Sequence, residues 1–367
     1  ICDGKIAMRQ NSTKNLTRRF VLAGAGALAA ATTLPVCAPA QTMPRKHRVP
    51  FGAALEYQHF LEDSDYTALF VEHCDMIFPM NALKWEALQY NRGEFDYLQA
   101  EGIIGFAEHL DRSTYGHTFV WYTALPDWVQ SITSARQAKK VLINHIHNVA
   151  GHFANTVPAW DVVNEVIAHD PRDKGAWRDS VWMRTLGLSH IDIAFAAAAE
   201  AAPNAELAIN DYDLGSVGPR CEARREAMLT LVRRLQDRGQ RIDSIGMQGH
   251  LDPDFPIDQE GLARFIRDLQ SLGVGYRITE LDVNDWKLPS DRYVRDEFSA
   301  DMVDQFLDAA FSTALPLSLS TWGLSDRYTW LSEVMPHRKG AKNRPLPFDE
   351  NLQPKPMFDV IQRYLAV

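Results

Sequence analysis

Cysteine is scarce in this sequence. The four cysteines are Cys2, Cys37, Cys74 and Cys221, and the first two lie in an N-terminal segment that we expect to be removed. Two distant cysteines in the remaining chain are too few for a disulfide framework or a cysteine metal site. Cys74 and Cys221 could pair in an oxidising compartment, but we expect two buried free thiols instead.

The chain also lacks an excess of positive charge. It has 38 Lys and Arg against 47 Asp and Glu, a formal net charge of -9 and a sequence pI of about 5.7. Such a field repels polyphosphates, so we exclude nucleic acid as a partner.

No apolar run in the N-terminal segment is long enough for a membrane span. The run from Ala23 to Thr33 is too short for roughly 30 Å of hydrocarbon, and Pro35 interrupts the segment. We therefore disfavour an anchor helix and stable membrane insertion. A lipoprotein site at Cys37 is also disfavoured, because Val36 is bulkier than the small residue that such cleavage prefers.

The same segment has the features of an export signal. Arg18-Arg19 precede the apolar run, and Ala38-Pro39-Ala40 provide a small-residue cleavage signal before Gln41. Paired arginines before a weakly apolar stretch resemble a twin-arginine signal. We expect residues 1–40 to be an export signal that is removed, and residues 41–367 to be a periplasmic or extracellular catalytic domain.

No linker or internal repeat divides the chain after His47, so we expect one domain. Short apolar runs alternate with helical patterns, and eight such alternations without an antiparallel block predict a single (β/α)₈ barrel. The predicted strands are Val49–Leu55, Asp75–Asn81, His117–Tyr122, Ala159–Asn164, Glu206–Asp211, Ser244–His250, Gly275–Glu280 and Pro316–Gly323. The predicted helices include Ala135–Phe153, Val181–Ala202, Arg220–Arg238 and Gln259–Ser271.

Polar residues gather at the C-terminal ends of the predicted strands. In a parallel barrel these ends meet at one face, where the active site is built. The residues found there are Asn81, Tyr122, Asn164, Glu165, Asn210, Asp211, Gln248, His250, Glu280, Asp282 and Trp322.

Two glutamates stand out among these residues. Glu165 follows the fourth predicted strand and Glu280 ends the seventh, so a barrel can bring them together across its mouth. Paired carboxylates are what cleavage of a glycosidic bond needs. For either residue alone, a structural ion pair at the rim would be preferred, but the two together favour catalysis.

The chain resembles glycoside hydrolase family 10, whose typical activity is endo-β-1,4-xylanase, from about Phe51 to the C-terminus. Each motif is weak alone, and their shared order is specific for fold and reaction. The segments that carry the resemblance begin at Asn81 (NALKW), Gly116 (GHTFVW), Leu125 (LPDW), Trp160 (WDVVNEV), Asn210 (NDY), Gly246 (GMQGHL), Ile278 (ITELDV) and Thr321 (TWG, with Asp326 and Trp330).

The resemblance implies a role for each matched residue. Glu165 would be the acid/base and Glu280 the nucleophile of a retaining reaction that needs no metal or organic cofactor. Asn164 would bind the 2-hydroxyl of the sugar in subsite −1, while His250 would hydrogen-bond Glu280 and Asp282 would fix the tautomer of His250. The other substrate contacts implied are Asn81, Lys84, His117, Tyr212 and Gln248, with Trp121, Trp322 and Trp330 as aromatic walls.

Structural alternatives stay open for some of these residues. His117 could be a satisfied core histidine, and Lys84 could merely neutralise nearby carboxylates. Trp85 and Trp160 are expected to be packing residues. His145, His147 and His152 lack a carboxylate at ligand spacing, so we predict that they lie on the outer surface of a helix and bind no metal.

The chain departs from the family pattern at two positions that help to bind the sugar in subsite −2. Met80 stands where the family usually has Glu, and Tyr122-Thr123-Ala124 replace His-Ser-Gln, so that Ala124 takes the place of Gln. Two hydrogen-bonding side chains are lost, each worth roughly 0.5–1.5 kcal/mol. We therefore expect an altered or weakened −2 subsite.

Three functions are compatible with these observations. The first is endo-acting hydrolysis of β-1,4-xylan, and the second is hydrolysis of another β-linked polysaccharide or exopolysaccharide. The third is a catalytically silent carbohydrate-binding barrel, which would not need the two glutamates. We expect a monomer whose partner is a polysaccharide or oligosaccharide.

Overall fold

The computed structural model describes residues 49–366. Eight parallel strands are hydrogen-bonded in the order β2-β1-β9-β8-β6-β5-β4-β3, and a bridge from Met76 to Ser113 lies at the remaining gap between β2 and β3. The predicted (β/α)₈ barrel is therefore confirmed. The strands are β1 (Phe51–Leu55), β2 (Met76–Pro79), β3 (Gly116–Val120), β4 (Ala159–Asn164), β5 (Glu206–Asp211), β6 (Ser244–Met247), β8 (Gly275–Val283) and β9 (Leu319–Thr321), with the short β7 (His250–Leu251) paired to the end of β8.

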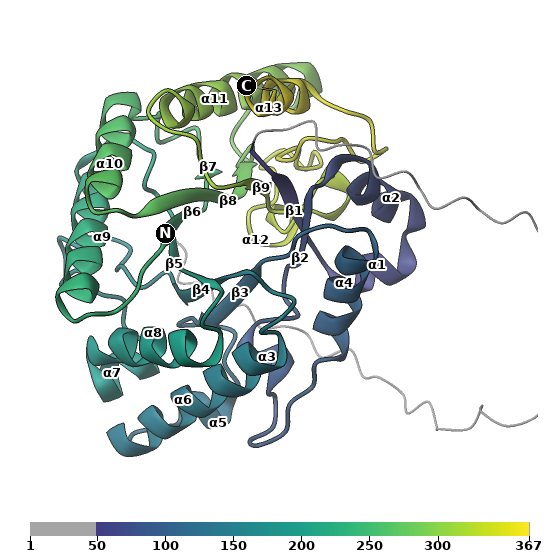
Figure 1. Cartoon of the computed structure of the whole chain (residues 1–367). Coiled ribbons are helices and arrows are strands. Elements are labelled where there is room, and N and C mark those ends of the chain that lie inside the picture. Colours follow the sequence, from purple (N-terminus) through teal and green to yellow (C-terminus); the bar gives the residue numbers. More distant parts are fainter. Residues whose placement is uncertain (1–48, 367) are drawn as a thin grey trace, which may run out of the picture. The chain divides into compact units, whose positions relative to one another are not determined.

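Helices surround the strands, as Figure 1 shows. They are α1 (Tyr57–Glu62), α2 (Ser64–His73), α3 (Trp85–Leu88), α4 (Leu98–His109), α5 (Asp127–Gln130), α6 (Ala135–His152), α7 (Val181–Leu186), α8 (Ser189–Ala201), α9 (Pro219–Asp237), α10 (Gln259–Ser271), α11 (Arg292–Phe311), α12 (Leu331–Val334) and α13 (Pro356–Leu365). The prediction of one helix over Val181–Ala202 was wrong. Gly187 has φ 58, a left-handed conformation that ends α7 before α8 begins.

The core joins the strands to the helices through large apolar side chains. Trp160 on β4 is fully buried and stacks on Phe119 of β3, with ring centroids 4.1 Å apart. Gly116 on β3 faces the same indole, and a Cβ at this position would lie 2.0 Å from Trp160. The absence of a side chain at Gly116 therefore makes room for the indole.

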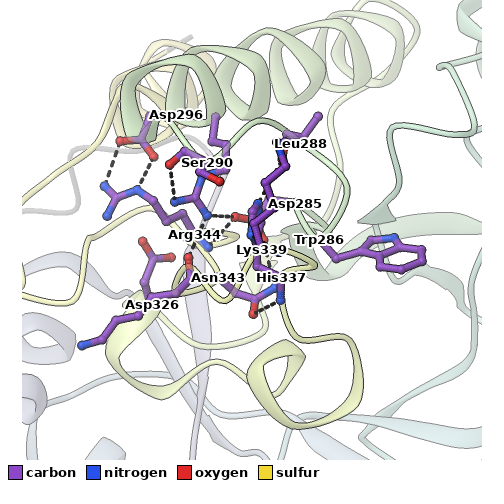
Figure 2. Close-up of polar contacts among 12 residues, drawn as sticks. Asp285, Trp286, Leu288, Ser290, Asp296, Asp326, His337, Lys339, Asn343 and Arg344 are labelled. Carbon is purple, nitrogen blue, oxygen red and sulfur yellow. Dashed lines mark hydrogen bonds and ion pairs between the residues drawn. The ribbon is translucent and has the colours of Figure 1, made fainter.

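A buried ionic network holds the segment that follows β8 (Figure 2). Asp285 accepts hydrogen bonds from Arg295 of α11 at 2.8 Å and from the backbone N–H of Arg344 at 2.8 Å. Arg344 also forms a bidentate ion pair with Asp296 of α11, in which its Nε and Nη2 donate to the two carboxylate oxygens at 2.7 and 2.8 Å. Paired charges of this kind can be buried because each one satisfies the other. The network ties the end of β8 to α11 and to the C-terminal segment.

Only some of the predictions about the cysteines and the N-terminal segment fall within the described residues. The predicted export signal, residues 1–40, and with it Cys2 and Cys37, lies outside the described residues. Cys74 and Cys221 are buried and free, as expected. Within residues 49–366, no helix combines the length and the apolar character that crossing a membrane requires.

Adding one methyl group at Gly116 should destabilise the barrel. We expect Gly116→Ala to lower the free energy of unfolding by about 1–3 kcal/mol, because the new Cβ collides with Trp160 in a well-packed core. Urea unfolding followed by tryptophan fluorescence measures the change. Gly151→Ala is the matched control, since nothing lies within 4 Å of that Cβ position in α6 and alanine favours a helix. Equal stability of Gly116→Ala and the unaltered protein would contradict this account.

Candidate active site

Glu165 and Glu280 lie at the C-terminal end of the barrel. Glu165 directly follows β4, and its φ of 53 is uncommon for a residue other than glycine. Its backbone is held at both ends, by a 2.8 Å hydrogen bond from its N–H to the Asn210 carbonyl and by a 2.9 Å hydrogen bond from Arg178 Nε to its own carbonyl. Glu165 is half-buried, whereas Glu280 on β8 is only 5% exposed.

A chain of amide side chains links the two carboxylates. Gln248 Nε2 donates to Glu165 Oε1 at 3.1 Å and lies 3.3 Å from the side-chain amide of Asn164. That amide lies 3.0 Å from Asn210 Nδ2, which donates to Glu280 Oε1 at 2.6 Å. The structure thus brings together four predicted residues from the ends of three strands, and it adds Asn210 as a direct partner of Glu280.

The second oxygen of Glu280 faces a histidine held by an aspartate. His250 Nε2 lies 3.1 Å from Glu280 Oε2, and His250 Nδ1 lies 2.8 Å from Asp282 Oδ1. These are the two contacts expected for His250 from the sequence. Asp282 also accepts a 2.8 Å hydrogen bond from Trp330 Nε1, so it orients an aromatic ring beside the same histidine.

These contacts set the ionisation of the pair. Burial lowers the pKa of His250, but Asp282 and Glu280 outweigh it and raise that pKa well above its ordinary value. Burial raises the pKa of Glu280, yet the hydrogen bond from His250 and the electrostatic effects of His117, His250 and Lys84 bring the net pKa below its ordinary value. Glu280 therefore stays ionised despite being buried.

Lys84 and Asn81 lie on the β2 side of the two glutamates. Lys84 Nζ donates to Asn81 Oδ1 at 2.6 Å, and Asn81 Nδ2 donates to Glu56 Oε2 at 2.6 Å. Burial lowers the pKa of Lys84, while Glu280, Glu165 and Glu56 act to raise it. Lys84 thus counters the charge of both carboxylates, as the structural alternative proposed, and it also lies where a polar contact to a ligand is possible.

Aromatic rings form the walls of this end of the barrel. The Lys84 ammonium lies 4.9 Å from the ring centroid of Trp121 and 5.4 Å from that of Trp322. Trp121 and Trp330 are half-buried, and Trp322 is 7% exposed. His117 packs edge-on against Trp322 at 5.3 Å, and its Nδ1 lies 2.8 Å from the buried Asp161. His117 is thus satisfied by the core while its ring remains part of the wall.

Tyr212 follows β5, which is the neighbour of β4 on the side away from β2 and Lys84. Its hydroxyl accepts a hydrogen bond from Arg178 Nη2, and the Arg178 guanidinium lies 4.4 Å from the ring centroid of Tyr122. Tyr122 is 40% exposed. An exposed aromatic ring backed by a guanidinium is a surface on which a sugar ring can stack.

The prediction that three histidines lie on a helix surface was wrong for His145. It is fully buried on α6, where its ring stacks on Trp85 at 3.6 Å and its Nδ1 lies 3.1 Å from Gln89 Oε1. His147 and His152 do lie near the surface, beside Glu200 and Glu101 respectively. Among the residues that the structure describes, no group of three His, Cys, Asp or Glu side chains is placed to hold a metal ion. Trp85 and Trp160 are core packing residues, as expected.

Two residues of the site were missed by the sequence prediction, and a third, Asn210, was found at a strand end without a role being assigned to it. Glu56 directly follows β1, so the rule that found the other site residues applied to it as well. Arg178 lies in the loop between β4 and α7, and no sequence pattern marks it. Its place beside Glu165 depends on how that loop folds back.

Comparisons with known proteins find similar sequences over most of the chain. Residues 40–364 match a family model described as glycosyl hydrolase family 10. The chain is 32% identical over 319 residues to "Endo-1,4-beta-xylanase 5" of Pyricularia oryzae, with 86% of this chain and 75% of that protein covered. It is also 32% identical over 322 residues to "Endo-1,4-beta-xylanase 1" of Humicola insolens, with 86% and 71% covered.

Solved structures of xylanases are also similar to this chain in fold and sequence. The crystal structure of xylanase 10B from Thermotoga petrophila in complex with xylobiose has a TM-score of 0.78 at 29% identity, with 86% of this chain and 94% of that chain covered. The intracellular xylanase TsXylA from Thermoanaerobacterium saccharolyticum has a TM-score of 0.75 at 31% identity, with 86% and 96% covered.

Removing the imidazole of His250 should raise the pKa of Glu280. In His250→Ala, burial acts on the carboxylate without the opposing hydrogen bond and charge, so we expect the pKa of Glu280 to rise. Carbon-13 NMR titration of labelled glutamate side chains measures this pKa. His152→Ala, which removes a surface histidine beside Glu101, is the control and should leave Glu280 unchanged. An unchanged Glu280 in His250→Ala would show that His250 does not set its ionisation.

Proposed function

This chain belongs to glycosyl hydrolase family 10, and on that premise we propose that it cleaves β-1,4-xylan, or a related xylose-containing polymer, by an endo-acting double displacement. The protein is a glycoside hydrolase. The reaction proposed retains the configuration of the anomeric carbon.

One observation carries the assignment of roles within the site. Glu280 is a buried carboxylate whose pKa is held below its ordinary value, and Glu165 is a less buried carboxylate connected to it through a chain of amide contacts. A nucleophile must be ionised, and an acid must be able to exchange its proton with a leaving group and with water. The environments of the two glutamates fit these different tasks.

In the first step, Glu280 attacks the anomeric carbon of the sugar in subsite −1. The bond to the glycosidic oxygen breaks, and Glu165 gives its proton to that oxygen as the leaving group departs. Asn210 and His250 hold the two oxygens of Glu280, which aims the carboxylate at the carbon. The product of this step is a covalent ester between Glu280 and the sugar.

In the second step, Glu165 acts as a base. The ester has removed the negative charge of Glu280, and Glu165 takes a proton from water as the water oxygen attacks the anomeric carbon. The bond to Glu280 breaks, which restores both glutamates and gives a product with the original configuration. Gln248 and the doubly held backbone keep Glu165 in place through both steps.

The surrounding residues suit a sugar ring held over this pair. Asn164 lies between the two glutamates, where its amide can bond the 2-hydroxyl of the reacting sugar. Trp121, Trp322 and Trp330 provide walls for the apolar faces of the ring. Tyr212 and Tyr122 both contact Arg178, which holds the backbone of Glu165, and they suit the leaving-group side.

Substitution of each glutamate should have a different effect on activity. Glu280→Gln removes the nucleophile and should abolish turnover of both xylan and 2,4-dinitrophenyl β-xylobioside. Glu165→Ala removes only proton transfer, so we expect a loss of roughly 10²–10⁴ in kcat on xylan and a much smaller loss in the first step with the dinitrophenyl substrate, whose leaving group needs no proton. Initial rates and burst kinetics on the two substrates measure these effects.

The exposed Glu226 on α9 supplies the control for this experiment, since Glu226→Gln should keep full activity on both substrates. Turnover by Glu280→Gln would overturn the assignment of roles. So would a Glu165→Ala variant whose first step with the dinitrophenyl substrate is slowed as much as its kcat on xylan.

We also propose that the protein is exported and acts as a monomer. Arg18-Arg19, the apolar run and Ala38-Pro39-Ala40 support export by a twin-arginine-like signal to the periplasm or beyond. A mass of two chains by light scattering would contradict the monomer.

Substitution of the paired arginines should block export. We expect the Arg18→Lys/Arg19→Lys double variant to accumulate inside the cell at its full length, because a twin-arginine signal is recognised through the arginine pair. Cell fractionation and N-terminal sequencing of the exported protein measure the outcome. Arg9→Lys, outside the pair, is the control. Unchanged export of the double variant would exclude this route.

A further inference from the structure

Glu56 places a carboxylate at the mouth of the barrel that the family resemblance did not supply. The residue directly follows β1 and precedes α1. Its Oε2 accepts a 2.6 Å hydrogen bond from Asn81 Nδ2, and its Oε1 accepts a 3.2 Å hydrogen bond from the N–H of Tyr57. The segment between β1 and α1 is thereby joined to Asn81, which follows β2.

The carboxylate of Glu56 retains capacity to bind a ligand. A carboxylate offers about four lone-pair positions, and the contacts to Asn81 and Tyr57 occupy one on each oxygen. Glu56 is only partly buried, so the remaining positions can reach a ligand. Two oxygens at a fixed separation suit the neighbouring hydroxyl groups of a pyranose ring.

The residues at the family's two contact positions cannot make these bonds. Met80 is 9% exposed and packs in an apolar cluster with Phe78 and Trp322. Ala124 carries only a methyl group. On this side of the site, the carboxylate therefore comes from the residue that follows β1 and not from the end of β2.

The position of Glu56 relative to the catalytic pair identifies the subsite. Hydrogen bonds join Glu56 to Asn81 and Asn81 to Lys84. The charge of Lys84 in turn interacts with both Glu280 and Glu165. β1 stands diametrically opposite β5, the strand that leads to Tyr212 on the leaving-group side. Glu56 thus lies on the side of the catalytic pair that is away from the leaving group.

We propose that Glu56 is a specificity-determining residue of subsite −2, where its carboxylate accepts hydrogen bonds from two neighbouring hydroxyls of the sugar. The proposal rests on the proposed function and deepens it. Asn81 fixes the orientation of the carboxylate, and Met80 leaves the space beside it apolar. The −2 subsite is therefore altered at positions 80 and 124 but is not simply lost, because Glu56 supplies the hydrogen-bond acceptor.

Two aryl glycosides that differ by one sugar test this assignment. 4-Nitrophenyl β-xyloside fills subsite −1 alone, whereas 4-nitrophenyl β-xylobioside fills −1 and −2. We expect Glu56→Gln to reduce kcat/KM for the xylobioside by roughly 10- to 100-fold, the effect of losing hydrogen bonds to a charged group, and to change kcat/KM for the xyloside by less than about threefold. Glu56→Asp keeps the charge and the helix cap but shortens the side chain, and it should also lose most of the advantage of the xylobioside.

The control is Glu62→Gln, which alters an exposed glutamate of the same helix α1 and should leave both substrates unaffected. Thermal unfolding shows whether each variant is folded. An unchanged preference for the xylobioside in folded Glu56→Gln and Glu56→Asp would overturn the proposal, and so would an equal loss on both substrates, which would indicate a structural role. If the unaltered protein turned over neither substrate nor xylan, the proposed function itself would fail, and that result is distinct from a change in preference.

Discussion

The site depends on keeping one buried carboxylate ionised. Glu280 is 5% exposed, and removing a carboxylate from water is costly unless other groups satisfy both of its oxygens. Asn210 donates to one oxygen, and His250, itself held by Asp282, faces the other. Without these partners, burial would favour the protonated acid, which cannot attack an anomeric carbon.

The barrel supplies these partners because its neighbouring strands end at the same level. β5, β6 and β8 are adjacent, so Asn210, Gln248 and Glu280 emerge side by side at the C-terminal face. The short β7 pairs with β8 in a register that sets His250 opposite Asp282. Beyond this pair, the ionic network of Asp285, Arg295 and Arg344 fixes the segment that follows β8 (Figure 2). The similarity to family 10 xylanases over 86% of the chain fits this arrangement.

Much of this could be predicted from the sequence because strand ends carry a clear signal. The alternation of strands and helices predicted the barrel, and the position of polar residues at strand ends identified Glu165, Glu280, Gln248 and His250 as site residues. His145 was misplaced because its neighbours in the sequence do not reveal that Trp85, 60 residues earlier, covers that face of α6. The pairing of Glu56 with Asn81 joins side chains from two strands, and Arg178 reaches Glu165 from a loop, so neither contact has a local signature.

The central claim is that Glu280 forms a covalent bond to the sugar. In a 2-deoxy-2-fluoro-β-xylobioside with a good leaving group, the fluorine slows both steps and the leaving group restores the rate of the first, so the covalent intermediate accumulates. Peptide mass spectrometry of the incubated protein then locates the trapped sugar. The account predicts one sugar adduct per chain, on the peptide that contains Glu280 and on that residue. An adduct on a different carboxylate, or inversion of the anomeric configuration in the product of normal turnover, would contradict it.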